Sequence, residues 1–277
     1  MRRAVTLVEL LVTLVVFGLV LGLITHTLLF HQRLQRRLQA ANAASRAAGQ
    51  ATTILAATLA DVARSDLVTN WSSDSAVEVM APVGVGVACV AGNELRTAAS
   101  ATEGEPPLVV FTATPEPGDR LMVFDDRPRP PLWRARTVVE VAPAVQPCAP
   151  TGLRAAPGFT LRLDSALDAS PIVAFRLLRR TRYDLYRSGD RLWYLGMREW
   201  NAQARAFNGV QPVAGPLQAY SMRAERTGLS FEYFDSVGGR LGVPLDSAVV
   251  SRVTITARPA DTTVGATRRS VAMRRAP

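Results

Sequence analysis

The most constraining feature of this sequence is an uncharged apolar run from Leu10 to Phe30, preceded directly by one carboxylate, Glu9. As a helix, these roughly 21 residues would rise about 30 Å, which matches the hydrocarbon core of a bilayer. The run therefore predicts a transmembrane helix. An acidic side chain in such a helix costs on the order of 2.5 to 3.5 kcal/mol near the centre and less toward the end, so Glu9 predicts a function. Its natural partner would be an amine.

The residues ahead of Glu9 could supply that amine. Cleavage between Ala4 and Val5 would remove a short basic leader, residues 1–4, and leave Glu9 as the fifth residue of the mature chain. This arrangement resembles the prepilin signal of type IV pilins and type II secretion pseudopilins, although that family usually has Gly where this chain has Ala4 and Phe where it has Val5. The resemblance implies that a prepilin peptidase cuts after Ala4 and methylates Val5. It also implies that Glu9 neutralises the N-terminus of a neighbouring subunit in a filament.

Two other interpretations of the N-terminus stay open. A conventional secretory signal would also carry leader arginines, and Ala41–Ala43 offers a small-residue cleavage site. Its apolar region is usually only about 7 to 15 residues long, and here Arg33, Arg36 and Arg37 separate the run from that site. A plain uncleaved anchor leaves Glu9 unexplained. Because arginines flank the run on both sides, the positive-inside rule does not fix its orientation.

Beyond the apolar run, a second pattern predicts that the helix continues. Small or apolar residues recur in steps of four and three, at Leu34, Leu38, Ala41, Ser45, Ala48, Thr52, Leu55, Leu59 and Val62. This spacing is typical of one face of an amphipathic helix. Since Leu10 to Leu67 lacks proline, we expect one helix of about 85 Å. Residues 5–30 would lie in lipid, and residues 31–67 would offer a narrow stripe to a globular domain rather than a coiled-coil partner.

Residues 68–277 change to short β-type runs separated by Pro and Gly, which predicts a largely antiparallel β domain. The expected strands are residues 109–112, 121–124, 137–141, 159–163, 183–187, 191–195, 229–234, 249–257 and 270–274. The clearest hairpin joins the fifth and sixth of these through Ser188–Asp190, with Gly189 available for a positive φ. The predicted fold class is α+β and pilin-like: a long N-terminal helix, transmembrane in its first half, packed on a largely antiparallel β domain.

The C-terminal half resembles one branch of the same superfamily. In order, the chain carries RYDLYRSGDRLWYL, QPVAGPLQAY, GLSFEYFDSVGGRL and VVSRVTITARP. This order is similar to that of J-type minor pseudopilins and PilW-like minor pilins. The resemblance implies a minor subunit at or near the tip of a type II secretion pseudopilus or type IV pilus, as part of an initiation complex. Its partners would be sibling minor pilins, a major pilin and an inner-membrane assembly platform, with the C-terminal domain in the bacterial periplasm.

Aromatic residues in these segments, among them Trp193, Tyr194, Phe231, Tyr233 and Phe234, are expected in the core rather than at a ligand. Residues 68–157 resemble nothing that we can name.

The excess of basic residues suggests anionic partners as a second class. All 32 basic residues are arginine, and with 23 acidic residues the net charge is +9. Such a balance can bind the phosphates of DNA or of anionic lipids. The densest cluster is Arg176, Arg179, Arg180, Arg182 and Arg187, which an extended strand would divide between two faces. Nucleic-acid binding, as in a pilin of DNA uptake, is therefore an alternative rather than the main prediction.

Residues suited to catalysis or metal binding are sparse. His26 and His31 lie at the end of the apolar run, which leaves the β domain without an imidazole for nucleophilic catalysis or zinc binding. Gly84–Gly86 lacks the third glycine of a phosphate-binding loop. The acid pairs Asp125–Asp126 and Glu103–Glu105 have no EF-hand spacing. We therefore predict no enzyme, no cofactor and no metal site, and keep a membrane-anchored periplasmic binding or hydrolytic domain as the alternative of another class.

The two cysteines, Cys89 and Cys148, indicate an oxidising compartment if they pair. A bond between them would close a loop of nearly 60 residues and stabilise the fold by something like 3 to 4.5 kcal/mol. Two buried free thiols are the alternative. We predict the disulfide.

Overall fold

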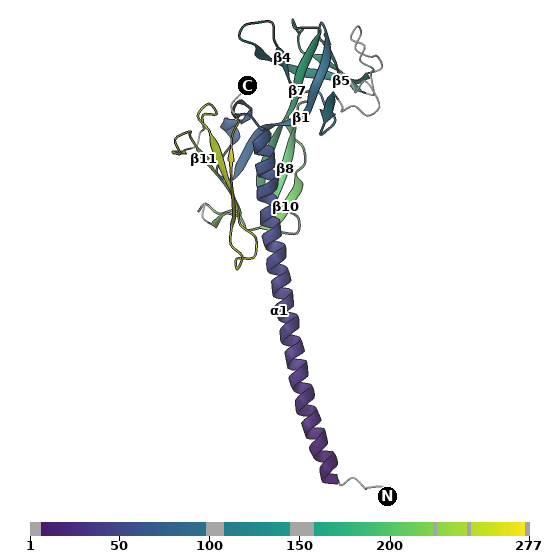
Figure 1. The fold of residues 1–277 in the computed structure, drawn as a ribbon, viewed down its shortest axis with the longest axis vertical. Helices are drawn as coiled ribbons and strands as arrows, with labels where there is room; N and C mark the ends of the chain where they lie inside the picture. The colour runs from purple at the N-terminus through teal and green to yellow at the C-terminus, as the bar shows by residue number, and fades with distance from the viewer. Residues whose placement is uncertain (1–6, 98–107, 145–157, 224–225, 243–244, 275–277) are drawn as a thin grey trace.

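The chain forms one long helix, α1 (Leu7–Asp61), whose C-terminal part packs on a largely antiparallel β domain (Figure 1). This computed structural model describes residues 7–97, 108–144, 158–223, 226–242 and 245–274. The α+β fold class predicted from the sequence is confirmed: a long N-terminal helix, apolar in its first half, packs on a largely antiparallel β domain. With 55 residues, α1 is about 80 Å long.

The helix ends before the predicted Leu67. Ala63 leaves the helical region, with φ −76° and ψ 158°, and forms an isolated parallel bridge with Arg274. The amide of Arg64 donates to the carbonyl of Arg274 at 3.0 Å. Two short 3-10 turns, η1 (Arg64–Asp66) and η2 (Thr69–Trp71), then lead into the first strand. The helix therefore ends where the backbone begins to hydrogen-bond with the distant C-terminal region. No local sequence pattern predicts this end.

The β domain contains a ten-stranded and a four-stranded sheet among the described residues. The strands are β1 (Ala76–Ala91), β2 (Glu94–Thr97), β3 (Val109–Phe111), β4 (Arg120–Asp125), β5 (Leu132–Ala144), β6 (Gly158–Leu163), β7 (Ile172–Arg187), β8 (Trp193–Asn201), β9 (Ala206–Phe207), β10 (Gln211–Leu217), β11 (Leu229–Phe234), β12 (Arg240–Leu241), β13 (Arg252–Ala257) and β14 (Thr267–Ala272). Each predicted strand has a counterpart in this order.

Six strands of the larger sheet close into a ring. β1 pairs with β2, β2 with β6, β6 with β5, β5 with β4, β4 with β7, and β7 again with β1. The interior of this small barrel is filled by apolar side chains: Val83, Ala88, Leu95, Leu121, Val123, Val138, Leu161, Leu163, Leu167, Val173, Phe175 and Leu177. β4 and β5 lie at the end of the molecule opposite the N-terminus (Figure 1). The barrel therefore forms a second core, distant from the exposed part of α1.

The other core joins α1 to both sheets. Leu55 and Leu59 of α1 are buried together with Phe231 and Tyr233 of β11 and Ile255 of β13. The same core includes the ends of β1 and β7 that lie outside the barrel, together with β8 and β10. Of the aromatic residues expected in the core, Phe231 and Tyr233 are buried, whereas Trp193, Tyr194 and Phe234 are half-buried.

Only part of the predicted helix stripe contacts the domain. Ala48, Thr52, Leu55, Leu59 and Val62 are buried, as expected. The first members of the stripe are not, because burial on α1 begins at Ala44: Leu34, Leu38 and Ser45 are exposed and Ala41 is half-buried. The expectation that the whole stripe from residue 34 would carry the domain is therefore wrong for its first half.

The hairpin between β7 and β8 forms as predicted but with different turn chemistry. The amide of Ser188 donates to the carbonyl of Leu192, and that of Arg191 to the carbonyl of Ser188, both at 2.9 Å. The residue with positive φ is Arg191, at 67°, and not Gly189. Asp190 offsets this strain locally, since its carboxylate accepts bonds from the Leu192 amide and the Tyr194 hydroxyl.

β1 is the main strand that the sequence pattern did not predict. Its register against β7 shifts between Pro82 and Gly84, and the Gly84–Gly86 segment lies inside the strand. A Cβ on Gly84 would come within 2.4 Å of the Phe111 ring, and one on Gly86 within 2.4 Å of the Leu108 carbonyl oxygen. These glycines therefore allow β3 to approach β1 closely. They interrupt the alternation expected of a strand because of this contact between distant parts of the chain.

Candidate membrane and assembly helix

The free part of α1 exposes a continuous apolar surface. Every side chain from Leu10 to Phe30 is exposed, and Leu19 and Leu23 exceed 70%. An 18-residue window of this helix has a mean hydropathy of 2.3 and none of it is buried. Large contiguous apolar surfaces on soluble monomers are rare. This one helix is long and apolar enough to span a membrane, as a single-pass anchor would.

The threonine hydroxyls inside the apolar segment are satisfied within the helix. The hydroxyls of Thr13, Thr25 and Thr27 donate to carbonyls three or four residues earlier, at 2.8 to 2.9 Å. In lipid, an unsatisfied hydroxyl or backbone group would be costly because no water is present to bond it. The segment is therefore compatible with a hydrocarbon environment despite its three threonines.

Of the predicted processing and assembly residues, the structure describes only Glu9. Glu9 belongs to the first turn of α1, far along the helix from the residues that pack on the β domain. Ala4 and Val5 lie outside the described residues. The cleavage, the methylation and the role of Glu9 all stay predictions.

The predicted disulfide concerns one described and one undescribed residue. Cys89 lies in β1 opposite Arg96 of β2 and Ile172 of β7, and it is disulfide-bonded. Cys148 lies outside the described residues. Pairing of Cys89 with Cys148 stays a prediction.

The arginine cluster of β7 is divided between two faces, as the strand periodicity predicts. On one face Arg179 is buried: its guanidinium contacts Asp119 at 2.7 and 2.9 Å, Glu199 at 3.1 Å and the carbonyl of Thr114 at 2.8 Å. Burial opposes its charge, but the bonds to Asp119 and the attraction of Asp119 and Glu116 raise the pKa of Arg179 above its usual value.

On the opposite face, Arg180 pairs with buried Glu78 and its guanidinium lies 4.7 Å from the ring centroid of Trp200. Arg176 and Arg182 each pair with an aspartate, Asp66 and Asp184 respectively. Carboxylates thus pair with four of the five arginines. Asp184 lies two residues from Arg182 on β7, whereas Asp66, Glu78 and Asp119 come from distant parts of the chain, where sequence spacing gave no signal for them.

Arg179 also marks a branch point in the larger sheet. β7 pairs with β4 over Phe175–Leu178 and with β8 over Thr181–Arg187. Arg179 lies between these two stretches, and it binds Asp119, just before β4, and Glu199 of β8. This buried ion cluster connects the barrel to the core that holds α1.

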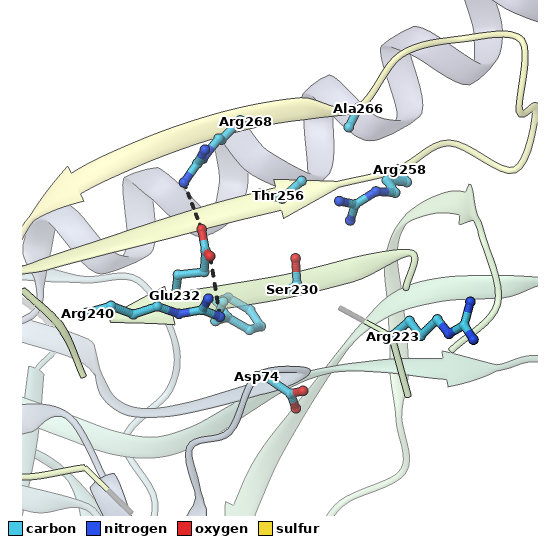
Figure 2. Close-up of a pocket in the computed structure, with 10 residues that line it drawn as sticks. Asp74, Arg223, Ser230, Glu232, Arg240, Thr256, Arg258, Ala266 and Arg268 are labelled. Carbon is cyan, nitrogen blue, oxygen red and sulfur yellow. Dashed lines mark hydrogen bonds and ion pairs between the residues drawn. The ribbon is translucent and has the colours of Figure 1, made fainter. Parts of the chain in front are cut away.

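A polar pocket of about 830 Å³ lies over β11, β13 and β14, with α1 behind the sheet (Figure 2). Its charged lining includes Glu232, which pairs with Arg268 at 2.7 Å and with Arg240 at 3.4 Å. Ser230 and Thr256 also line it, but no imidazole does.

Of the acidic residues considered for calcium, Asp125 and Asp126 bind other side chains of the protein. Asp125 is buried between Arg127 at 3.0 Å and Arg134 at 2.7 Å, and the bonds from Arg127 hold the pKa of this carboxyl well below its usual range. Asp126 accepts a bond from Ser170, and Glu103 and Glu105 lie outside the described residues. Within the described part of the chain, no group of three or more His, Cys, Asp or Glu side chains could hold a metal.

No protein-family model, curated protein or solved structure matches the chain. What stands is the architecture itself: one long apolar N-terminal helix on an antiparallel β domain, which is compatible with a pilin-like layout.

Proposed function

We propose that this chain is a minor pilin or pseudopilin that assembles through α1 into a type II secretion pseudopilus or a type IV pilus. The observation that carries the proposal is the division of α1. One uninterrupted helix has an exposed apolar first half and a second half that is built into a β domain. The leader, Val5, Glu9 and the order of C-terminal segments resemble the same superfamily.

The free half of α1 suits two apolar environments in turn. Its exposed leucines, valines and phenylalanines would gain about 25 cal/mol for each Å² removed from water, whether lipid or neighbouring helices cover them. Gly18 and Gly22 have no heavy atom within 4 Å of an added Cβ. Small residues four apart let another helix approach closely, so the segment can lie in the membrane first and pack against sibling subunits later.

Glu9 would set the register of this packing. Its position in the first turn of α1 places it at the membrane end of the helix, just ahead of the uncharged run. A carboxylate there attracts the cationic N-terminus of an adjacent subunit, and such charge-assisted bonds are about twice as strong as neutral ones.

The position of the barrel supports a place at or near the filament tip. In Figure 1 the barrel strands β4 and β5 lie beyond the C-terminal end of α1, on the side away from the N-terminus. In a filament of parallel helices, such a mass would collide with a subunit stacked above it. At the tip no subunit lies above, and sibling minor pilins would flank the domain in an initiation complex.

Mass spectrometry of the membrane-extracted protein tests the proposal. We expect a chain that begins at methylated Val5 and that depends on a prepilin peptidase. An N-terminus at Ala44 would identify a conventional secretory signal instead. A chain that keeps its leader, whatever peptidase is present, would leave a membrane-anchored binding or hydrolytic domain as the better account. Salt-sensitive DNA binding by correctly processed protein would favour DNA uptake within the same superfamily.

A further inference from the structure

Three arginines follow the apolar segment of α1 without any charge partner within the described chain. Arg33, Arg36 and Arg37 are all exposed, and no ion pair involves them. The helix offers none either, because Leu10 to Ala60 contains no Asp or Glu. No carboxylate of the described residues therefore serves as their counterion. We call these three residues the arginine collar.

The collar lies on the face of α1 that carries the domain. Because 18 residues make about five helical turns, Arg33 points in the same direction as Ala51, and Arg37 in the same direction as Leu55. Both Ala51 and Leu55 are fully buried against the domain. The domain-bearing face of the helix thus continues below the domain as a row of guanidinium groups, about 27 Å nearer the N-terminus.

The depth of the collar matches the headgroup layer of a bilayer. If the apolar run ends at Phe30, the Cα atoms of Arg33, Arg36 and Arg37 lie about 4.5, 9 and 10.5 Å beyond it along the helix. The headgroup region adds roughly 5 to 8 Å on each side of the hydrocarbon core. Helical side chains tilt toward the N-terminus, and here that direction is toward the membrane. Long arginine side chains can therefore place their guanidinium groups among the phosphates.

Arg46 provides a contrast on the same helix. It lies about 24 Å beyond Phe30, past the headgroup layer, and its Nε donates to the carbonyl of Asn42. Arg46 is also exposed. Arg46 thus shares its exposure and charge with the collar but lies farther from the apolar run.

We propose that the arginine collar binds the phosphate groups of anionic phospholipids in the leaflet next to the β domain. This proposal rests on the membrane span in the proposed function, but it does not depend on processing or filament assembly. Guanidinium groups match phosphate oxygens in geometry and charge. Binding would hold α1 at a fixed depth and keep the domain close to the membrane surface before assembly.

The test uses the full chain in nanodiscs of phosphatidylglycerol and phosphatidylcholine, with native mass spectrometry of the lipids that stay bound. We expect the wild-type chain to retain phosphatidylglycerol preferentially. The triple variant Arg33→Gln, Arg36→Gln, Arg37→Gln should lose on the order of 100-fold in this selectivity at low salt, and Arg37→Gln alone about fivefold. Arg46→Gln should keep it, as should a charge-matched triple variant at exposed Arg191, Arg205 and Arg269 of the domain.

Three results would overturn the proposal. Equal selectivity in the wild type and the collar variant would show that the arginines do not bind lipid phosphate, and an equal loss in the domain variant would show only a net-charge effect. Self-association in phosphatidylcholine alone that disappears in the collar variant would assign the collar to carboxylates of a second copy. Carbonate extraction of each variant separates these outcomes from failure of the span, because a chain stripped from the bilayer contradicts the proposed function itself.

Discussion

The two halves of α1 use similar residues in opposite ways. From Leu10 to Ala40 every side chain of the helix is exposed, and Arg33, Arg36 and Arg37 have no carboxylate partner among the described residues. From Ala44 onward, alanines and leucines are buried against strands of both sheets. The two halves of one helix are thus stabilised differently. The second half packs within the molecule, whereas the first half has an apolar surface that lipid or other subunits could cover.

The largest expected difference concerns arginine in the two environments. Arg179→Ala should lower the free energy of unfolding by about 3 to 5 kcal/mol, because it leaves the buried Asp119 carboxylate without its partner. Arg37→Ala removes an exposed side chain and should change it by less than about 0.5 kcal/mol. Denaturant unfolding of the full chain in detergent, followed by tryptophan fluorescence, measures both. Similar effects of the two variants would contradict the contrast.

Leucine should show the next largest difference. Leu55 is fully buried, and Leu55→Ala should destabilise the domain by about 2 to 5 kcal/mol through lost burial and a cavity. Leu23 is 72% exposed, and Leu23→Ala should leave domain unfolding unchanged. The same unfolding measurement applies. A loss of stability in Leu23→Ala would mean that the free half contributes to the domain after all.

Adding volume to alanine tests the closeness of helix packing. Ala51 has no exposed surface, so Ala51→Leu should cost about 1 to 3 kcal/mol by overpacking against the strands. Ala43 lies one position before burial begins and is exposed, so Ala43→Leu serves as the matched control. Thermal melts of the two variants should separate by several degrees. Equal melting temperatures would place the domain further from α1 than the structure does.

The smallest expected effect is a pH dependence at the end of the helix. Burial raises the pKa of Asp66 above its ordinary value, against the attraction of Arg176. A carboxyl with a raised folded-state pKa favours folding when protonated, so its contribution is present below about pH 3.9 and is lost as pH rises through the folded-state value. Asp66→Asn should therefore stabilise the domain slightly at neutral pH.

Unfolding of the Asp66→Asn variant across pH 3 to 7, about the range in which carboxyls titrate, checks the sign. Its stability should depend less on pH than that of the wild type in this window. Asp61→Asn, at an exposed position five residues earlier, is the control. A variant that is less stable than the wild type at neutral pH would show that the ion pair with Arg176 outweighs the burial of Asp66.

Local patterns predicted much of this molecule. The apolar run and the helix periodicity are local, as are alternating strands such as β11, whose bounds Leu229–Phe234 agree with the expectation. The ring of strands was not predictable in this way, because β7 joins β1 and β4 from distant parts of the chain. β1 was missed because Pro82, Gly84 and Gly86 are explained only by its bulge and by contact with β3.

For the candidate site too, features that depend on local sequence could be predicted, and features that depend on distant residues could not. The membrane segment is visible in the sequence because lipid compatibility depends on composition over a short window. The role of the β7 arginines was not visible, since Arg179 finds Asp119 at a separation of 60 residues. The role that we propose for Glu9 depends on another molecule, so neither the sequence nor one isolated chain would contain its partner.

The most direct measurement of the central claim is therefore assembly of the Glu9→Gln variant at native expression levels. The substitution keeps shape and hydrogen bonding but removes the charge, so the variant should insert in the membrane and be cleaved after Ala4 as the wild type is. If α1 assembles through Glu9, crosslinking and co-purification with sibling subunits should be lost, together with filament initiation or secretion. Wild-type assembly by the variant would contradict the account.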